Sequence, residues 1–376
     1  MSHSLPYLAN CSMLFTELPL LQRPAAARSA GFGAVEFWWP FEDPVPGDAT
    51  VDAFVTAVGD AGVRLVGLNF FAGDLAGPDC GVLSIPARSQ QFRDNIDVTV
   101  GIGERLGASG FNALYGVRVD GVAEQEQDEL AVTNITDAAR AAAGIGATVF
   151  IEPVSGPKPY PLRRAADAAA VVDRARAAGA GNVGILFDIY HLASNGDDID
   201  RAIAAYAGQV AHVQIADAPG RGEPGTGQLD LDGYLTRLGQ AGYAGWVGLE
   251  YKPTVPTVDS LAWLPRERRA GPAGRRAGSS REGSAPGPPS RSSGWASWAA
   301  RWPATSSRPA TTSPATTAAR PRSTPWWPPG AAARPVWPER SPAPTWWPRC
   351  CPTRPTSPRC SAARTGCSRT PGRARW

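Results

Sequence analysis

Short apolar runs alternate with longer amphipathic stretches through the first 269 residues of this 376-residue chain. The short runs are rich in β-branched and aromatic residues, and the longer stretches are rich in alanine and repeat apolar positions at helical spacing. The expected strands are residues 7–13, 34–39, 65–71, 111–116, 148–153, 183–191, 210–217 and 246–252. The expected helices include residues 51–61, 89–106, 128–143, 163–178 and 229–240.

Eight strands joined by helical crossovers are typical of parallel βα units. The runs are apolar on both faces, as expected for parallel strands that are covered on both sides. Eight such units are the number that closes a barrel, whereas doubly wound sheets usually stop at fewer strands. We therefore predict an α/β fold, a (β/α)₈ TIM barrel, over residues 1–269.

A polar residue interrupts the apolar run near the end of each of the last four expected strands. In a parallel barrel the strand ends form the rim that carries the active site. Burying such groups without partners costs several kcal/mol each, so four in register indicate a shared partner. They are Glu152, Asp188, Gln214 and Glu250.

Three carboxylates and one amide oxygen are hard ligands, which suit Mg²⁺ or Mn²⁺ better than a metal that prefers thiolates. A single acid at a strand end is more often a helix cap or a member of an ion pair. Three acids and one amide at equivalent positions on consecutive strands are difficult to explain as four independent helix caps. We therefore predict one divalent metal site at this rim.

Several segments around these residues resemble the hydroxypyruvate isomerase family, within the xylose-isomerase-like barrels. They read Ile-Glu-Pro, Phe-Asp-Ile-Tyr-His, His-Val-Gln-Ile-Ala-Asp, Pro-Gly-Arg-Gly-Glu-Pro-Gly-Thr-Gly and Gly-Leu-Glu-Tyr-Lys-Pro. The resemblance covers residues 7–269. It implies that the four residues bind the divalent ion and that Glu152 and Glu250 also transfer protons. It further implies substrate contacts for His191 and Arg221, and Gln214 favours the hydroxypyruvate branch over ketose epimerases, where histidine is usual.

The residue types suit an isomerase that moves a carbonyl group between adjacent carbons. Two carboxylates can serve as base and acid, and a metal can stabilise the enediolate between the two steps. Arg221 would supply a planar fork for the carboxylate of a 2-oxo or hydroxy acid. We expect interconversion of hydroxypyruvate and 2-hydroxy-3-oxopropanoate (tartronate semialdehyde). A ketose 3-epimerase is the alternative enzyme.

Other polar and aromatic residues near the strand ends stay open between a site role and a structural one. Lys158 and Asn69 are candidate substrate contacts, although a solvated loop lysine and a structural hydrogen bond explain them as well. His191 could be a satisfied rim histidine. Lys252 is open between the same two roles as Lys158. A choice between a role at the site and a structural role also applies to Glu36, Trp38, Trp39, Phe70, Phe71 and His212.

The glycine-rich segment 220–225 matches the dinucleotide fingerprint G-x-G-x-x-G. That fingerprint requires a strand, a tight turn and an immediately following helix. Pro224 and the absence of a following helical pattern contradict this context. We interpret the segment as a loop after the seventh strand, and expect no nucleotide cofactor.

The composition changes sharply after residue 269. Residues 1–269 carry 20 Lys and Arg and 32 Asp and Glu, a net charge of −12, whereas residues 270–376 carry 17 Arg and two acids, a net charge of +15. The second segment contains no Leu, Ile, Phe, Tyr or Met, so it has nothing to build a core from. We predict a disordered tail rich in Pro, Arg and Trp over residues 270–376.

The tail reads like coding DNA translated in the wrong frame. If the third base of each codon is joined to the first two of the next, residues 289–317 permit Val-Ala-Phe-Ile-Gly-Leu-Gly-Val-Met-Gly-Gly-Pro-Met-Ala and a following helix-like segment. This resembles the start of a 3-hydroxyisobutyrate dehydrogenase-type enzyme, the class that includes tartronate semialdehyde reductase. We hypothesise a frameshift past the isomerase's stop codon. An inactive fusion product, or a tail that binds nucleic acid, is the non-enzyme alternative.

The remaining composition limits the other classes of function. No apolar run reaches the roughly 18 residues that span a bilayer, and the N-terminus does not read as a signal peptide. Cys11 and Cys80 are isolated, as in a reducing cytoplasm. We expect a cytoplasmic enzyme with a small-molecule substrate, no membrane partner and no specific nucleic acid. The pattern leaves homo-oligomer formation open.

Overall fold

The computed structural model describes residues 3–75, 79–156 and 160–271. Lys158 and residues 272–376 lie outside the described residues. The predictions made for them, including the tail and the domain boundary at residue 269, stay predictions.

The eight predicted strands are present and form a closed barrel in chain order. Each strand pairs in parallel with the next, and the last pairs with the first. The strands are β1 (Tyr7–Asn10), β2 (Ala34–Phe37), β3 (Arg64–Asn69), β4 (Gly110–Asn112), β5 (Thr148–Ile151), β6 (Val183–Asp188), β7 (Val210–Ile215) and β8 (Val247–Leu249).

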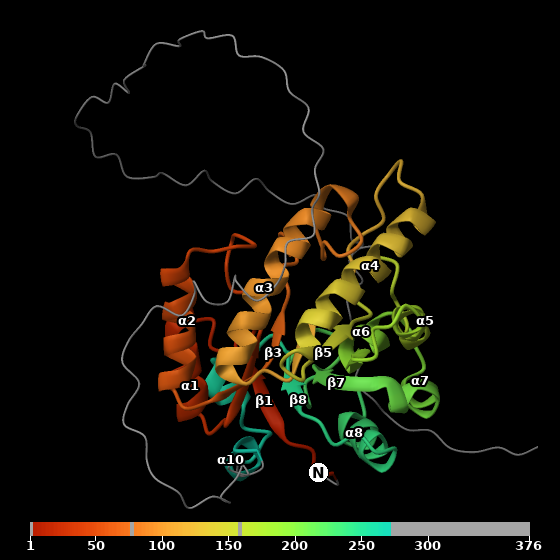
Figure 1. The fold of residues 1–376 in the computed structure, drawn as a ribbon. Helices are drawn as coiled ribbons and strands as arrows, with labels where there is room; N and C mark the ends of the chain where they lie inside the picture. The colour runs from red at the N-terminus through yellow and green to blue at the C-terminus, as the bar shows by residue number, and fades with distance from the viewer. Residues whose placement is uncertain (1–2, 76–78, 157–159, 272–376) are drawn as a thin grey trace, which may run out of the picture. The chain divides into compact units, whose positions relative to one another are not determined.

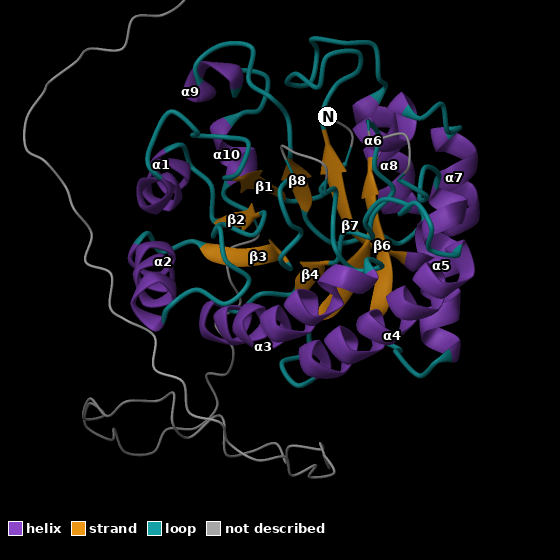
Figure 2. Ribbon diagram, turned by 90° about the horizontal axis from the view of Figure 1, so that it is seen from above, coloured by secondary structure: helices purple, strands orange, loops and turns teal. Residues whose placement is uncertain are grey.

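Helices surround the strands on the outside of the barrel (Figure 2). The five helices expected from the apolar spacing are present within a few residues of their predicted ends. The helices are η1 (Leu20–Gln22), α1 (Arg23–Ser29), α2 (Asp48–Asp60), η2 (Pro86–Arg88), α3 (Ser89–Leu106), α4 (Glu124–Ala143), α5 (Ala165–Ala177), α6 (Ile189–Ser194), α7 (Ile199–Tyr206), η3 (Ala207–Gln209), α8 (Leu231–Gln240), α9 (Thr257–Ser260) and α10 (Arg266–Arg269). None of the helices in the described ranges is long and apolar enough to cross a bilayer.

The helix α3 shows how the sequence produces one layer of this arrangement. Phe92, Ile96 and Val100 recur every four residues and are buried, while the opposite face is polar. Gly107 ends the helix in the left-handed conformation, at φ 73°, which a residue without a side chain adopts easily. The helix therefore starts and stops at its predicted ends, and it lies beside α2 and α4 in the outer ring (Figure 1).

All eight strands end two to four residues earlier than predicted, and three of them show why. β1 ends at Asn10 instead of residue 13, and β6 ends at Asp188 instead of residue 191. β4 ends at Asn112 instead of residue 116, because the following residues pair with the segment near Gly81 instead of with the barrel. Each strand therefore places its last residue at the rim.

The barrel interior is packed by aromatic rings next to glycines. A Cβ atom at Gly110 would lie 1.9 Å from the Phe150 ring, so only glycine leaves room for this side chain. The Phe150 ring in turn stacks on His212, with ring centroids 5.3 Å apart and planes at 8°. This contact holds a histidine in the barrel interior, below the rim.

Candidate active site

Each of the eight strands carries a buried polar side chain within one residue of its end. The rim thus carries a ring of carboxylates and amides that the packing withdraws from water. The ring consists of Asn10, Glu36, Asn69, Asn112, Glu152, Asp188, Gln214 and Glu250.

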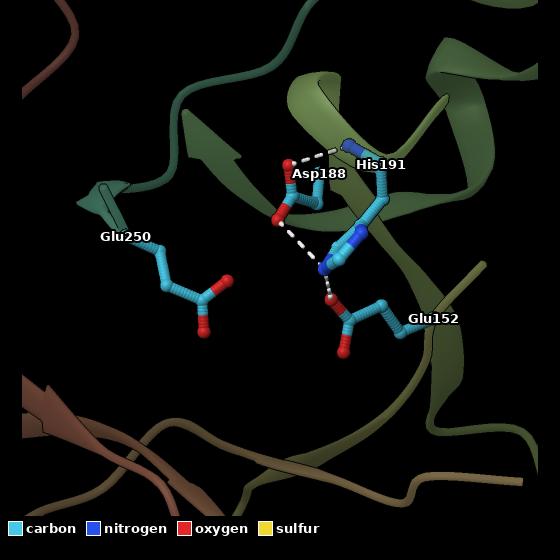
Figure 3. Close-up of side chains that lie close together, drawn as sticks. All are labelled: Glu152, Asp188, His191 and Glu250. Carbon is cyan, nitrogen blue, oxygen red and sulfur yellow. Dashed lines mark hydrogen bonds and ion pairs between the residues drawn. The ribbon is translucent and has the colours of Figure 1, made fainter. Parts of the chain in front are cut away.

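Three of the four predicted ligands come together in one cluster with a histidine. Glu152, Asp188, His191 and Glu250 each offer one ligand atom, and these four atoms lie within 4.8 Å of one another. Figure 3 shows Glu152 and Glu250 reaching into the site from different sides, with the His191 ring beside Asp188 and Glu152. Gln214 stands next to Asp188 in the sheet, where the two residues are register partners.

Asp188 serves both as a helix cap and as a member of this cluster. Its Oδ1 accepts the backbone N–H groups of Tyr190 at 2.8 Å and His191 at 3.2 Å, which begins α6. The prediction that His191 ends the sixth strand is therefore wrong, because this cap turns the chain into a helix. The other oxygen, Oδ2, has no hydrogen-bond partner among the described residues.

The hydrogen bonds of His191 determine what its ring can do. The backbone N–H of Ser155 donates to Nδ1 at 3.0 Å, so the proton of the neutral ring is on Nε2. This Nε2 lies 3.7 Å from Asp188 Oδ2 and 4.0 Å from Glu152 Oε1. Burial, together with the charge of Arg221, lowers the pKa of His191 to about 3. The ring is thus a neutral hydrogen-bond donor toward the cluster, which suits a substrate oxygen better than a metal ion.

The amide of Gln214 is oriented by a hydrogen bond. Its Nε2 donates to Glu36 Oε1 at 2.8 Å, while its Oε1 is buried and has no partner among the described residues. Asp188 Oδ2 and Asn112 Oδ1 are likewise buried acceptors without a hydrogen-bond partner among the described residues. Several unpartnered oxygens at one rim suit a hard divalent cation. Glu152, Asp188, Gln214 and Glu250 therefore fit the metal group that the sequence predicts.

Burial of the three carboxylates makes them resist ionisation. It raises the pKa of Glu152 well above its usual value, and the charges of Glu250 and Asp188 raise it further. Burial likewise raises the pKa of Asp188, against the opposing charge of Arg221. It raises the pKa of Glu250 to about 7, again opposed by Arg221. A cation at this position would relieve the repulsion that these shifts reflect.

Arg221 lies over the cluster from the loop that follows β7. Its Nη2 donates to Glu250 Oε2 at 2.7 Å and lies 4.0 Å from Asp188 Oδ2. Its guanidinium carbon lies 5.3 Å from the centroid of the Tyr190 ring. Its Nε is buried and has no partner among the described residues, so this donor is available to an anionic ligand.

Two acids hold the loop that presents Arg221. Asp217 accepts the N–H groups of Ala218, Gly225 and Leu229, and Glu223 accepts both the N–H and the hydroxyl of Thr254. Arg221 itself adopts φ 62°, a conformation that is unfavourable for a residue with a side chain. No helix follows until Leu231, which confirms that residues 220–225 are not a dinucleotide fingerprint.

The sequence analysis missed two asparagines of the ring. Asn112 donates to Glu152 Oε2 at 2.7 Å, and Asn10 donates to both Glu36 Oε1 at 3.1 Å and Glu250 Oε1 at 3.2 Å. Each is the last residue of an apolar strand, so a polar residue at a strand end, the signal that indicates the acids, also marks these asparagines.

The structure gives contacts for three of the residues that the sequence leaves open between two roles. Trp38 donates its indole N–H to Glu250 Oε1, so it walls the site. His212 is a hydrogen-bond partner of Glu36. Asn69 is buried at the rim beside a small cavity in the barrel interior.

The fold agrees with a family model that matches the sequence. The model described as Xylose isomerase-like TIM barrel matches residues 24–267. The chain belongs to the xylose isomerase-like TIM barrel family. The family likeness predicted from the strand-end segments is thereby confirmed.

Curated relatives within the xylose isomerase-like barrels carry isomerase names. A protein of Streptomyces coelicolor named "Putative hydroxypyruvate isomerase" is 55% identical over 69% of this chain and 96% of its own length. The "Hydroxypyruvate isomerase" of Escherichia coli is 30% identical over 69% of this chain and 98% of its own. A "2-oxo-tetronate isomerase" of Pectobacterium atrosepticum is 30% identical over 68% of this chain and 95% of its own. The chain thus falls among isomerases of this barrel family.

Proposed function

We propose that this chain is a metal-dependent isomerase that interconverts hydroxypyruvate and 2-hydroxy-3-oxopropanoate (tartronate semialdehyde) through an enediolate. The observation that carries the proposal is the cluster of three buried carboxylates, together with one oxygen each of Asp188 and Gln214 and one Arg221 N–H that make no hydrogen bond among the described residues. The names of the relatives from Streptomyces coelicolor and Escherichia coli support the substrate.

Glu152, Asp188, Gln214 and Glu250 would hold the divalent ion, with Mg²⁺ or Mn²⁺ favoured by the oxygen donors. When bound, such an ion supplies Lewis-acid stabilisation of the negative charge that develops on the two substrate oxygens. The ion also offsets the repulsion among the carboxylates, which lets them ionise near neutral pH.

The reaction moves one proton between carbons and one between oxygens. One carboxylate of the pair Glu152 and Glu250 removes a proton from C3 of hydroxypyruvate, which leaves the enediolate. The other carboxylate delivers a proton to C2, while the hydroxyl proton passes from the oxygen on C3 to the oxygen on C2. The two side chains enter the site from different sides, which suits a base and an acid that act on adjacent carbons (Figure 3).

Arg221 and His191 would orient the substrate for these transfers. Arg221 keeps one donor on Glu250 and offers Nε to the substrate carboxylate. His191, neutral and protonated on Nε2, would donate to a substrate oxygen beside Glu152. The Asn69 side chain at the rim is a further proposed substrate contact.

The experiment that tests the proposal is a direct assay of the purified chain with hydroxypyruvate. We expect turnover that EDTA abolishes and that Mn²⁺ or Mg²⁺ restores, with deuterium from D₂O entering the carbon-bound position of the product. Turnover that persists at full rate after exhaustive chelation would contradict the metal role. Absence of turnover with every divalent ion would contradict the substrate.

A second candidate is a longer 2-oxo acid, because the relative from Pectobacterium atrosepticum is named a 2-oxo-tetronate isomerase. The same residues would act on it. Comparing kcat/KM for hydroxypyruvate, 2-oxo-tetronate and a ketohexose distinguishes this candidate, and also the ketose 3-epimerase alternative, from the first.

The tail sequence supports the substrate independently. We propose that residues 270–376 are an out-of-frame reading of a neighbouring gene for a reductase that consumes tartronate semialdehyde. Resequencing the locus tests this, since correcting the frameshift would restore both a stop codon near residue 269 and the reading frame of the reductase. An in-frame tail in a clean read would contradict it.

A further inference from the structure

One buried carboxylate of the rim, Glu36, does not belong to the cluster. Glu36, at the end region of β2, is only 3% exposed. Its Oε2 accepts from His212 Nε2 at 2.6 Å, and its Oε1 accepts from Asn10 Nδ2 at 3.1 Å and Gln214 Nε2 at 2.8 Å. Three N–H donors therefore surround one carboxylate.

This carboxylate determines which end of the Gln214 amide is turned away from Glu36. The Glu36 oxygen that accepts a hydrogen bond from Asn10 also accepts one from Gln214, so it binds the NH₂ group of the amide and not its oxygen. Since the amide is planar, the oxygen is directed away from Glu36. That oxygen is the buried, unpartnered Gln214 Oε1 described above.

The surroundings of Glu36 keep it in this position. A Cβ atom at Gly248 on β8 would lie 2.4 Å from Glu36 Oε1, so the glycine leaves room for the carboxylate beside Gln214. On the other side, His212 is held by its stack on Phe150 and aims Nε2 at Glu36. The carboxylate thus fits a space that the neighbouring strands provide for it.

We propose that Glu36 is a positioning residue that holds the Gln214 amide with its oxygen toward the divalent cation. The inference rests on the proposed function, because it assigns Gln214 as a ligand of the proposed metal. It explains how an amide, which can present either oxygen or nitrogen, acts as a reliable oxygen ligand. Glu36 acts through Gln214 and contacts neither the cation nor the substrate.

The test is the Mn²⁺ dissociation constant of the full chain, measured by isothermal titration calorimetry without substrate. In Glu36→Gln the new amide can accept or donate, so the Gln214 amide is no longer restricted to one orientation. We expect the Mn²⁺ Kd to rise about 10- to 100-fold, as is usual when a group that orients a metal ligand is lost. Glu17→Gln, which removes an exposed carboxylate, should leave the Kd unchanged.

The double variant E36Q/Q214E separates orientation from a merely structural role of Glu36. It exchanges the amide and the carboxylate, so total charge and shape are kept. The carboxylate introduced at position 214 presents oxygen in either orientation, and the amide introduced at position 36 can donate to it. We expect a Kd within a few-fold of the unsubstituted chain. This variant also serves if E36Q alone does not fold.

The outcomes distinguish the two proposals. Failure of the unsubstituted chain to bind Mn²⁺ overturns the proposed metal site, and the role of Glu36 with it. Mn²⁺ binding that E36Q leaves unchanged overturns the role of Glu36 alone. Gln214→Leu, which removes the proposed ligand, gives the Kd expected when this ligand is lost. A folded double variant that binds Mn²⁺ as weakly as Gln214→Leu likewise overturns the role of Glu36, because it shows that Glu36 does not act by orienting the amide.

Discussion

The guanidinium of Arg221 donates to Glu250 across 2.7 Å while its Nε stays without a partner among the described residues. One nitrogen of the guanidinium is therefore committed to a proposed proton-transfer carboxylate, while another keeps its N–H donor. A substrate carboxylate bound by that donor would be positioned relative to the proposed base. A lysine could supply the charge but not two donors in a fixed plane.

Replacing Arg221 with lysine should chiefly weaken substrate binding. We expect KM for hydroxypyruvate to rise about 10- to 100-fold, the range that corresponds to losing a hydrogen bond between charged groups. Steady-state kinetics with saturating Mn²⁺ measures this. Arg237→Lys, which changes a surface ion pair, is the matched control and should leave KM unchanged. An Arg221→Lys variant with normal KM would remove Arg221 from substrate binding.

Replacing either proposed proton-transfer glutamate should lower the rate of turnover, and an exchange measurement should distinguish their two roles. Glu152→Gln and Glu250→Gln are each expected to lower kcat about 10²- to 10⁴-fold, the usual contribution of general acid–base catalysis. Deuterium exchange from D₂O into unreacted hydroxypyruvate then identifies which carboxylate acts on C3, because only that variant stops exchange. Glu104→Gln, an exposed substitution on α3, serves as control. Near-normal turnover in either variant would contradict the assigned pair.

The sequence predicts the barrel well because its signal is repeated eight times. Alternating apolar runs and amphipathic stretches need no knowledge of distant contacts, and polar residues at strand ends stand out against the apolar runs. The sequence also marks the start of α6, since Asp188 is a typical N-cap residue. Interpreting Asp188 only as a ligand places His191 wrongly on a strand.

The partners of the ring residues could not be predicted in the same way. Asn10 and Glu250 are 240 positions apart, and only closure of the barrel brings them to 3.2 Å. Glu36 and His212 likewise meet across 176 positions. No local pattern contains such pairs, so the asparagines were missed and the role of Glu36 stayed open.

Asn112, which the sequence analysis missed, provides a test of the geometry around Glu152. Asn112→Asp replaces an N–H donor at 2.7 Å with a like charge, so it should raise the pKa of Glu152 further. We expect the acidic limb of the kcat/KM profile to move to higher pH and kcat to fall about 10-fold. A pH profile with saturating Mn²⁺ measures both. An unshifted limb would show that Asn112 does not influence the reacting carboxylate.

Stability of the metal-free protein should depend on pH through Glu250. Burial raises the pKa of this carboxyl to about 7 from its ordinary value of 4.5. The folded state therefore holds the proton more tightly than the unfolded state. This stabilising contribution is complete below about pH 4.5 and is lost as the pH rises through about 7.

Glu250→Gln removes this titration and gives the comparison. In EDTA, we expect the melting temperature of the variant minus that of the unsubstituted chain to increase as the pH rises from 5 to 8. The charge of Glu250 also acts on His191 and Glu152, so the difference reports the titration of Glu250 together with its coupling to these two groups. Mn²⁺ should remove the pH dependence in the unsubstituted chain. A difference that stays constant across this range would contradict the raised pKa.

The contacts of the last described residues predict where the barrel can be shortened. Arg269 donates to the backbone carbonyls of Ala30, Leu261 and Leu264, and Arg268 donates to that of His3. A chain that ends at Gly271 keeps all of these bonds, so we expect its melting temperature and kcat/KM to match those of the full chain. A chain that ends at Leu264 leaves carbonyls without donors, at about 1–3 kcal/mol for each buried one. Its melting temperature should fall by several degrees. If the chain ending at Gly271 failed to fold, residues 272–376 would belong to the working enzyme and the frameshift proposal would lose its structural basis.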